Sequence, residues 1–329
     1  MATQSPPAGK GNVAPGRAVI GWGLGTLPMA IYFNSFNILA LRYFTDFVGL
    51  TAAAAGTLIG LSKIYDAFSD PIMGMVSDRT RGAMGRRRPY LLGGGLLCAL
   101  SIFLLFSAPV GLSDVQAFWY VAFVVILYAT SYTLYNIPYM AMPAEITVDA
   151  GQRSTMMSWR VVCIGVGGLI AGTLGPKLVA WGGDGLAVRR LIGIVLAALI
   201  AVPACLTVFL TRGASAGEVV RSTLPVPLRE RARTVIENRP FLLLLTLKFF
   251  QLCAIAISSG TLAFFTVWVL GRDYSALGTI ILFSSVGQII GAPLWLRLKG
   301  VLGSRMAFFL SAGLFAAISL TWLLADAEE

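Results

Sequence analysis

The stretch TAAAAGTLIGLSKIYDAFSDPIMGMVSDRTRGAMGRRRP, residues 51–89, decides the fold. Residues 51–75 are mainly apolar and numerous enough for a helix that crosses a bilayer, which needs about 20 residues. A loop rich in arginine follows at residues 79–88. Because basic clusters mark the cytoplasmic ends of membrane helices, this stretch predicts a transmembrane helix that ends in the cytoplasm.

Apolar segments of similar length recur along the whole chain. Together they predict about nine transmembrane helices and therefore an all-α, polytopic membrane protein. The first segment is too long, and too polar around Asn34 and Asn37, for a cleaved signal peptide. The predicted spans are residues 19–44, 51–75, 90–110, 116–140, 155–181, 187–211, 240–270, 275–297 and 304–325.

The composition supports a membrane protein. Of the 329 residues, 57% are hydrophobic and 12% are charged, whereas soluble proteins carry about 25% charged residues. A soluble enzyme or a nucleic-acid-binding domain is therefore close to excluded. The chain has no His, which excludes His-based metal sites and triads. Its four Cys lie singly in apolar segments, without the spacing of a disulfide framework or a zinc site.

The net charge of +10 indicates the orientation of the chain. If the N-terminus is cytoplasmic, most of the 25 Lys and Arg residues fall in cytoplasmic segments, as the positive-inside rule requires. Nine spans then place the C-terminus outside. We expect an integral protein of the cytoplasmic (inner) membrane that contacts anionic lipid, with no nucleic-acid partner.

The hydrophilic segments divide the chain into four parts. Residues 1–18 are expected to be a disordered cytoplasmic tail, since their start is rich in Gly, Pro, Ser and Gln. Residues 19–211 hold six spans and are expected to form an N-terminal six-helix bundle. Residues 212–239 are the longest hydrophilic segment and form a central cytoplasmic loop. Residues 240–329 hold three spans, which form a partial C-terminal bundle.

Two carboxylates lie well inside the second span. Each charged residue at mid-membrane costs about 2.5–3.5 kcal/mol on insertion scales, and the i, i+4 spacing of Asp66 and Asp70 puts both on one helical face. Two such carboxylates repel unless a cation or a proton lies between them, so the pair suits Na⁺, Li⁺ or H⁺. The alternative is an ion pair between Lys63 and Asp66 that only holds helices together.

Polar groups in other spans outline a site for a neutral polar solute. Span 4 ends in a polar run around Pro138, whose missing amide hydrogen frees a backbone carbonyl. Each of these side chains is more often a packing contact than a ligand, but together they predict a polar face in the first bundle. The candidates for solute binding are Asn34, Tyr132, Asn136, Tyr139 and Arg160.

The loop after the second span has two interpretations. Its charges orient the helix ends in the membrane. They are also candidates for a gate, in which the charged side chains bridge neighbouring helix ends in one conformation and separate in another. The candidate gating residues are Asp78, Arg79, Arg86 and Arg87.

The run Lys63-Ile-Tyr-Asp66-Ala-Phe-Ser-Asp70-Pro-Ile-Met-Gly74, continued by Asp78-Arg79-Thr80-Arg81 and Gly85-Arg86-Arg87-Arg88-Pro89, resembles the glycoside–pentoside–hexuronide:cation symporter family of the major facilitator superfamily. Asn136-Ile-Pro138-Tyr139 and Arg160 continue the match. The resemblance implies major facilitator-like bundles and a coupling cation, Na⁺ or H⁺, at Asp66, Asp70 and Thr133. It implies sugar contacts at Asn136 and Arg160, with Lys63 beside the cation site.

The chain departs from that family in two places. Ala30 occupies the position of a first-span Asp that grips galactosides, which argues against a galactoside substrate. The family has twelve spans, and nine are predicted for this chain. Lysolipid symporters resemble the same family, so a lysolipid-like amphiphile is an alternative solute.

The sequence therefore predicts a secondary transporter that couples a cation to a sugar or glycoside-like solute by alternating access. Its partners are that solute, the cation and membrane lipid; a protein partner stays open. No cofactor and no enzyme activity are expected. The alternative is a truncated or non-transporting membrane protein, such as a remnant, a sensor or an assembly partner.

Overall fold

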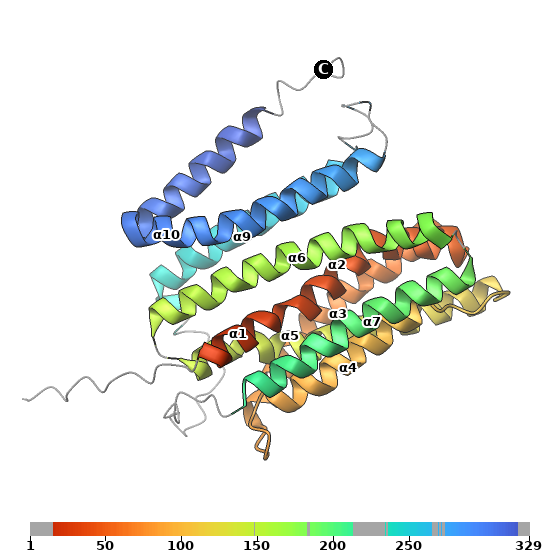
Figure 1. Cartoon of the computed structure of the whole chain (residues 1–329), viewed down its shortest axis with the longest axis horizontal. Coiled ribbons are helices and arrows are strands. Elements are labelled where there is room, and N and C mark those ends of the chain that lie inside the picture. Colours follow the sequence, from red (N-terminus) through yellow and green to blue (C-terminus); the bar gives the residue numbers. More distant parts are fainter. Residues whose placement is uncertain are drawn as a thin grey trace, which may run out of the picture. The chain divides into compact units, whose positions relative to one another are not determined.

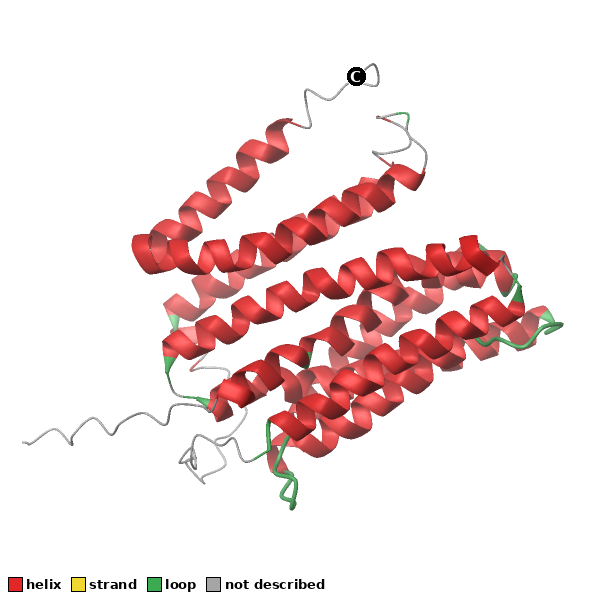
Figure 2. Cartoon of the chain, in the orientation of Figure 1, coloured by secondary structure: helices red, strands yellow, loops and turns green. Residues whose placement is uncertain are grey.

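A computed structural model describes residues 16–147, 149–182, 185–212, 234, 236–264, 269, 271 and 274–321. All regular elements in these ranges are helices (Figure 2), as predicted for an all-α protein. The chain divides into two compact units, Met1–Glu218 with Ile281–Ala307 and Val219–Ile280 with Phe308–Glu329. Most of the predicted tail at 1–18 and of the predicted loop at 212–239 lies outside the described residues.

The helices follow the predicted spans closely. The first span comprises two helices and a short π-helix, and each of the next five spans is one α-helix. The bounds are α1 Gly16–Leu24, α2 Thr26–Arg42, η1 Tyr43–Phe47, α3 Ala52–Arg79, α4 Arg88–Leu105, α5 Asp114–Ile146, α6 Ala150–Gly182, α7 Leu186–Leu210, α9 Arg239–Phe264 and α10 Tyr274–Thr321.

Local sequence determines where α3 and α5 begin. Thr51 has an extended backbone, and its hydroxyl accepts a hydrogen bond from the Ala54 amide at 3.2 Å. Ser113 and Gln116 form a capping box, in which each side chain accepts a hydrogen bond from the other residue's amide. Such caps satisfy amide groups that have no partner inside the helix, so both helices start at these residues.

A glycine divides α10 into two helical parts. Gly303 has a positive φ of 78° and a ψ of 165°, a conformation outside the helical region that side chains disfavour. The position of this break agrees with the boundary between the predicted spans 275–297 and 304–325. The two predicted spans are therefore two helical segments joined at one glycine.

Five described helices, or six if one bent pair counts as a single span, are long and apolar enough to cross a membrane. They include α4, α5 and α7 at full length. Helix α3 is 28 residues long, which exceeds the about 20 that a span requires, but Lys63, Asp66 and Asp70 lower its hydropathy. The charged residues of α3 are thus energetically unfavourable within a helix that is long enough to cross a membrane.

The first unit is a bundle of adjacent helices (Figure 1). Helix α4 packs on α5 and α7, α3 packs on α5, and α2 packs on α6 and α7. Its core contains large aromatic side chains, among them Trp22, Tyr32 and Tyr135, which are fully buried. The Tyr32 hydroxyl satisfies its polarity by hydrogen bonds to Ser131 at 2.7 Å and to Ser101, which links α2, α4 and α5.

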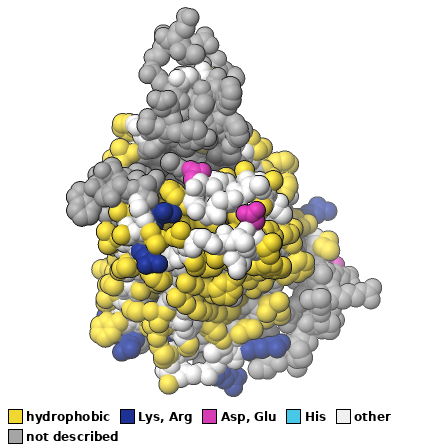
Figure 3. All heavy atoms as spheres, turned by 90° about the vertical axis from the view of Figure 1, so that its right-hand side faces the viewer, with side chains coloured by type: hydrophobic (Ala, Val, Ile, Leu, Met, Phe, Trp, Pro, Cys, Tyr) yellow, Lys and Arg dark blue, Asp and Glu magenta, His cyan; other side chains and the backbone are white. Residues whose placement is uncertain are grey.

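The outward faces of the helices are apolar. On α5, Trp119, Phe123 and Ile126 recur at helical spacing and are 67%, 60% and 52% exposed. The one face of the molecule seen in Figure 3 also carries many hydrophobic side chains with few charges between them. Such a surface suits lipid tails rather than water, since a soluble protein seldom exposes a large contiguous apolar area.

Candidate functional site

The two carboxylates of α3 lie next to hydroxyl groups of α5. Thr133 Oγ1 donates a hydrogen bond to Asp70 Oδ1 at 2.7 Å. Ser69 Oγ lies 3.3 Å from Thr133 Oγ1 and 3.4 Å from the carbonyl oxygen of Asp66. Helices α3 and α5 thus bring two carboxylates and two hydroxyls together. Each of these groups has an oxygen atom that could coordinate a cation.

Asp66 has one paired and one unpaired oxygen. Its Oδ2 accepts a hydrogen bond from Lys63 Nζ at 3.2 Å, and the two side chains are 18% and 51% exposed. Its Oδ1 is buried and has no hydrogen-bond partner among the residues that the structure describes. The ion pair that the sequence offered as an alternative therefore exists, but it satisfies only half of the carboxylate. A buried carboxylate oxygen without a donor is costly unless a cation or a proton reaches it.

Tyr132 of α5 lies in the same region as the carboxylates of α3 and Arg160 of α6. Its ring lies 6.0 Å from that of Phe33 on α2. Both Tyr132 and Arg160 are partly exposed. Three helices, α3, α5 and α6, therefore contribute polar groups to one region of the first unit.

The other predicted solute contacts differ in their surroundings. Asn136 is partly exposed and follows Tyr132 by one helical turn. Asn34 is partly buried, and its amide donates to the Ala30 carbonyl at 2.8 Å within α2. Tyr139 is 1% exposed, and its hydroxyl bonds to the Trp22 carbonyl at 2.7 Å and to Thr26 at 2.6 Å. Tyr139 therefore packs in the core, away from any solute that stays on the exposed side of Tyr132 and Asn136.

The predicted gating residues gather at one end of the bundle. Arg87 is 7% exposed and forms ion pairs with Asp78 and with Glu145, the latter at 2.9 Å. Arg86 also pairs with Glu145, whereas Arg79 is exposed. Arg87, the residue just before α4, therefore joins the end of α3 through Asp78 to the end of α5 through Glu145, and Glu145 also binds Arg86.

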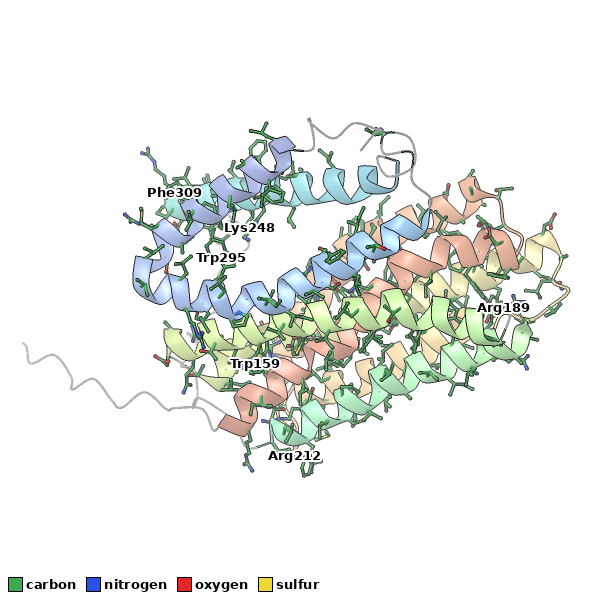
Figure 4. The ribbon with its side chains drawn as sticks, turned by 45° about the horizontal axis from the view of Figure 1, so that its top comes forward. Trp159, Arg189, Arg212, Lys248, Trp295 and Phe309 are labelled. Atoms are coloured by element: carbon green, nitrogen blue, oxygen red, sulfur yellow. The ribbon has the colours of Figure 1, made fainter. Side chains whose placement is uncertain are left out.

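The same end of the bundle includes the end of α7. Arg88 donates a hydrogen bond to the Thr211 carbonyl, next to Arg212. Arg212 and Arg189 mark the two ends of α7 (Figure 4), and Arg189 stacks over the Phe47 ring at 4.4 Å. In the second unit, Lys248 of α9 donates to Gln251 of its own helix at 2.8 Å. Its ammonium group is thus bound within α9.

Two residues of this region were missed by the sequence analysis. Ser69 precedes Asp70 and contacts Thr133, but a serine inside an apolar helix is common and gives no distinct signal. Tyr128 is 2% exposed and lies near Asp66, and its hydroxyl has no hydrogen-bond partner in the described ranges of the chain. The spacing to Tyr132, one helical turn, could have indicated a second tyrosine near the carboxylates.

The chain was compared with models of known protein families. The model of the family described as "MFS/sugar transport protein" matches residues 21–329. The chain belongs to this family. Members of the MFS/sugar transport protein family are transporters and not enzymes, which confirms both the expected fold and the expected class of protein. The resemblance to glycoside and cation symporters, inferred from residues 63–89, is confirmed with it.

Individual relatives are symporters and carriers. The chain is 30% identical to the inner membrane symporter YicJ of Escherichia coli K12, over 94% of the chain and 67% of that protein. It is 28% identical to the putative glycoside/cation symporter YagG of the same strain, again over 94% and 67%. It is 26% identical to the glucuronide carrier protein homolog of that strain, over 90% of the chain and 64% of that protein. The chain thus spans about two thirds of these relatives.

Proposed function

We propose that this chain binds a monovalent cation and a sugar-like solute and carries both across the cytoplasmic membrane. The buried, unpaired Oδ1 of Asp66 is the observation that carries this proposal. A bound cation or proton would satisfy this oxygen, and Asp70, Thr133 and Ser69 supply further oxygens beside it. The coupling ion is Na⁺ or H⁺, as the relatives named as symporters suggest for this chain.

The donor set favours a monovalent ion. Among the described residues, no three His, Cys, Asp or Glu side chains gather in a way that could hold a metal ion. Two carboxylates, one of them paired with Lys63, leave a single negative charge for the ion to balance. Divalent ions of the calcium type take six to eight oxygen ligands and usually several carboxylates, which this region does not offer.

Cation binding and solute binding would be coupled because the two sites lie next to each other. The ion would balance the charge that Lys63 leaves on Asp66 and Asp70, and Tyr132 lies near both carboxylates and Arg160. Binding of the ion therefore changes the field in which the solute binds, and linkage requires the solute to change the ion's affinity by the same factor. We further propose that the helix bundles rock about this region and expose it to each side of the membrane in turn. The basic end with Arg86 and Arg87 would face the cytoplasm.

Uptake by purified protein in proteoliposomes tests this function. A sodium gradient and a proton gradient are applied separately, with panels of glycosides and of lysolipids as solutes. We expect one gradient to drive uptake of a glycoside, and Asp66→Asn or Asp70→Asn to remove the stimulation. Asp114→Asn is the matched control, since Asp114 is exposed at the start of α5.

Three results would contradict parts of this proposal. Stimulation that persists in Asp70→Asn would remove the carboxylates from the cation site. Uptake of lysolipids in place of glycosides would change the solute class. Cation binding without any uptake would indicate a non-transporting membrane protein, the alternative that the sequence left open.

A further inference from the structure

Tyr128 of α5 carries a buried hydroxyl that the described groups do not satisfy. Its side chain is 2% exposed, and no described atom forms a hydrogen bond with its hydroxyl. A buried hydroxyl without a partner is unfavourable, because it has lost its hydrogen bonds to water. A phenylalanine would fill the same space without this cost. The hydroxyl therefore calls for a bound group as its partner.

The ring of Tyr128 is held in place by α2. It stacks on Phe36 at 3.8 Å and on Tyr32 at 4.4 Å, with interplanar angles of 17° and 22°. Tyr32 and Phe36 are one helical turn apart and so lie on the same face of α2. The Tyr32 hydroxyl also donates a hydrogen bond to the Tyr128 carbonyl at 3.2 Å. Packing against α2 thus determines where the Tyr128 hydroxyl lies.

The neighbouring hydroxyl groups are bonded to one another. The Tyr32 hydroxyl bonds to Ser131 at 2.7 Å and to Ser101. Ser131 donates to the Tyr128 carbonyl at 3.0 Å, and Ser101 donates to the Cys98 carbonyl at 3.0 Å. This network links α2, α4 and α5, and the Tyr128 hydroxyl is not part of it.

Asp66 of α3 supplies a second unsatisfied atom in the same region. It lies near Tyr128, and its buried Oδ1 has no hydrogen-bond partner within the described ranges. The two atoms therefore do not bond to each other, although a tyrosine hydroxyl can donate to a carboxylate. One small polar species that contacts both of them would satisfy both. That species is either a water molecule or an ion.

The charge in this region favours an ion. Lys63 pairs with Oδ2 of Asp66, so the two carboxylates of α3 keep one negative charge that a water molecule cannot balance. A proton on Oδ1 would balance it through a single oxygen. A hard metal cation instead needs several oxygen ligands, which fits the additional hydroxyls of Tyr128 and Thr133. Thr133 donates its hydrogen to Asp70, so the lone pairs of its oxygen remain for a cation.

We propose that Tyr128 is a further ligand of the coupling ion and that this ion is Na⁺. The Tyr128 hydroxyl oxygen binds the ion together with Oδ1 of Asp66. This inference rests on the proposed function and selects between the two ions that it leaves open. Because the Tyr128 ring stacks on α2, the bound ion also connects α2 with the carboxylates of α3.

Thermal unfolding of the purified chain in detergent tests this inference. The midpoint is measured against sodium chloride at fixed pH, with choline chloride keeping the ionic strength constant. An ion that binds only the folded protein raises the midpoint with its concentration. In Tyr128→Phe, the sodium concentration for half of the stabilisation should rise about three- to tenfold, as the loss of one neutral polar contact predicts.

The same variant is expected to be no less stable than the wild type without sodium. Phenylalanine keeps the stacked ring and removes the unpaired hydroxyl. Tyr32→Phe is the matched control, because the Tyr32 hydroxyl of the same stack is bonded to Ser131 and Ser101. This control should lower the midpoint without sodium and leave the sodium dependence unchanged. A Tyr128 hydroxyl that served only packing, or that held only a water molecule, would give the pattern of the control.

The outcomes separate this inference from the proposed function. An unchanged sodium dependence in Tyr128→Phe overturns the inference, and so does a variant that fails to fold, since the hydroxyl would then serve the packing. A wild-type chain that does not respond to sodium also overturns it, while proton-driven uptake would keep the proposed function. If Tyr128→Phe weakens the sodium response and the wild type carries no solute, the inference stands and the proposed transport fails.

Discussion

Thr133 Oγ1 donates a hydrogen bond to Asp70 Oδ1 at 2.7 Å and so ties α5 to α3 beside the unpaired oxygen of Asp66. The hydroxyl orients Asp70 and leaves its own lone pairs available. Asp70 therefore has a fixed direction in a helix where a free carboxylate would be costly. The contact joins the helix that supplies the carboxylates to the helix that supplies Tyr132.

Thr133→Ala is predicted to weaken cation binding. Loss of the hydroxyl removes one oxygen and releases Asp70, and hydrogen bonds to charged groups contribute about 1.5–3 kcal/mol. The cation concentration for half-maximal uptake should rise about tenfold or more. Thr133→Ser keeps the hydroxyl and should behave like the wild type. An unchanged concentration in Thr133→Ala would exclude Thr133 from the cation site.

Glu145→Gln is predicted to destabilise the basic end of the bundle. Glu145 accepts from Arg86 and Arg87, and Arg87 is almost fully buried. Without this carboxylate, Arg87 keeps only Asp78 and Ser77 as described partners of its guanidinium. Removing one partner of a buried ion pair costs about 3–5 kcal/mol, and the partial exposure of Glu145 reduces that figure here. Thermal unfolding in detergent should show a lower midpoint than for Asp114→Asn.

Uptake by the same variant tests the gating interpretation. A gate that closes through Glu145 should open more readily in Glu145→Gln, so solute exchange at equilibrium should change as well as stability. A lower midpoint with unchanged exchange rates would assign these charges to orientation and stability alone.

Much of the fold follows from the sequence because membrane helices need long apolar segments. The start of α5 and both ends of α7 agree within two residues with the spans predicted from hydropathy, whereas α5 continues to Ile146, beyond the predicted end at residue 140. The division of α10 at Gly303 agrees with the boundary between two spans. The break at Gly25 between α1 and α2 was not predicted. Gly25 keeps a helical backbone, with φ −63° and ψ −12°, and tertiary packing requires a glycine there, since a Cβ would lie 2.7 Å from the Tyr139 ring and 2.8 Å from Thr207.

The candidate site could be predicted only in part, because it too depends on contacts between helices. The i, i+4 spacing of Asp66 and Asp70 fixes their common face within a single helix. Which oxygen is satisfied, and by which helix, depends on contacts over long sequence distances. Thr133 bonds to Asp70 across 63 positions, and the Tyr139 hydroxyl bonds to Trp22 across 117. A polar residue in a span therefore gives no sign of whether it faces a solute or the core.

Gly167→Ala is predicted to disturb the contact between α2 and α6. The added methyl group would lie 3.0 Å from backbone atoms of Ala30 and Ile31, which cannot rotate away. Overpacking of this kind costs about 1–3 kcal/mol, so the unfolding midpoint should fall. Gly56→Ala is the matched control, because nothing lies within 4 Å of the new methyl group. Alanine also favours the helix over glycine, so this control should be neutral or slightly stabilising.

Tyr139→Phe and Tyr132→Phe are predicted to separate packing from solute binding. The Tyr139 hydroxyl bonds to Thr26 and to the Trp22 carbonyl, and its ring stacks on that of Trp22 at 4.8 Å. Its loss should cost about 1–2 kcal/mol of stability, because a buried acceptor is left without its donor, while solute affinity stays unchanged. Tyr132→Phe should instead weaken solute binding and leave the unfolding midpoint close to the wild type, since the Tyr132 side chain is partly exposed. Calorimetric binding and thermal unfolding of both variants measure the two effects together.

If Tyr139→Phe weakens solute binding as strongly as Tyr132→Phe does, the solute must reach deeper into the bundle than the packing of Trp22 against Tyr139 allows.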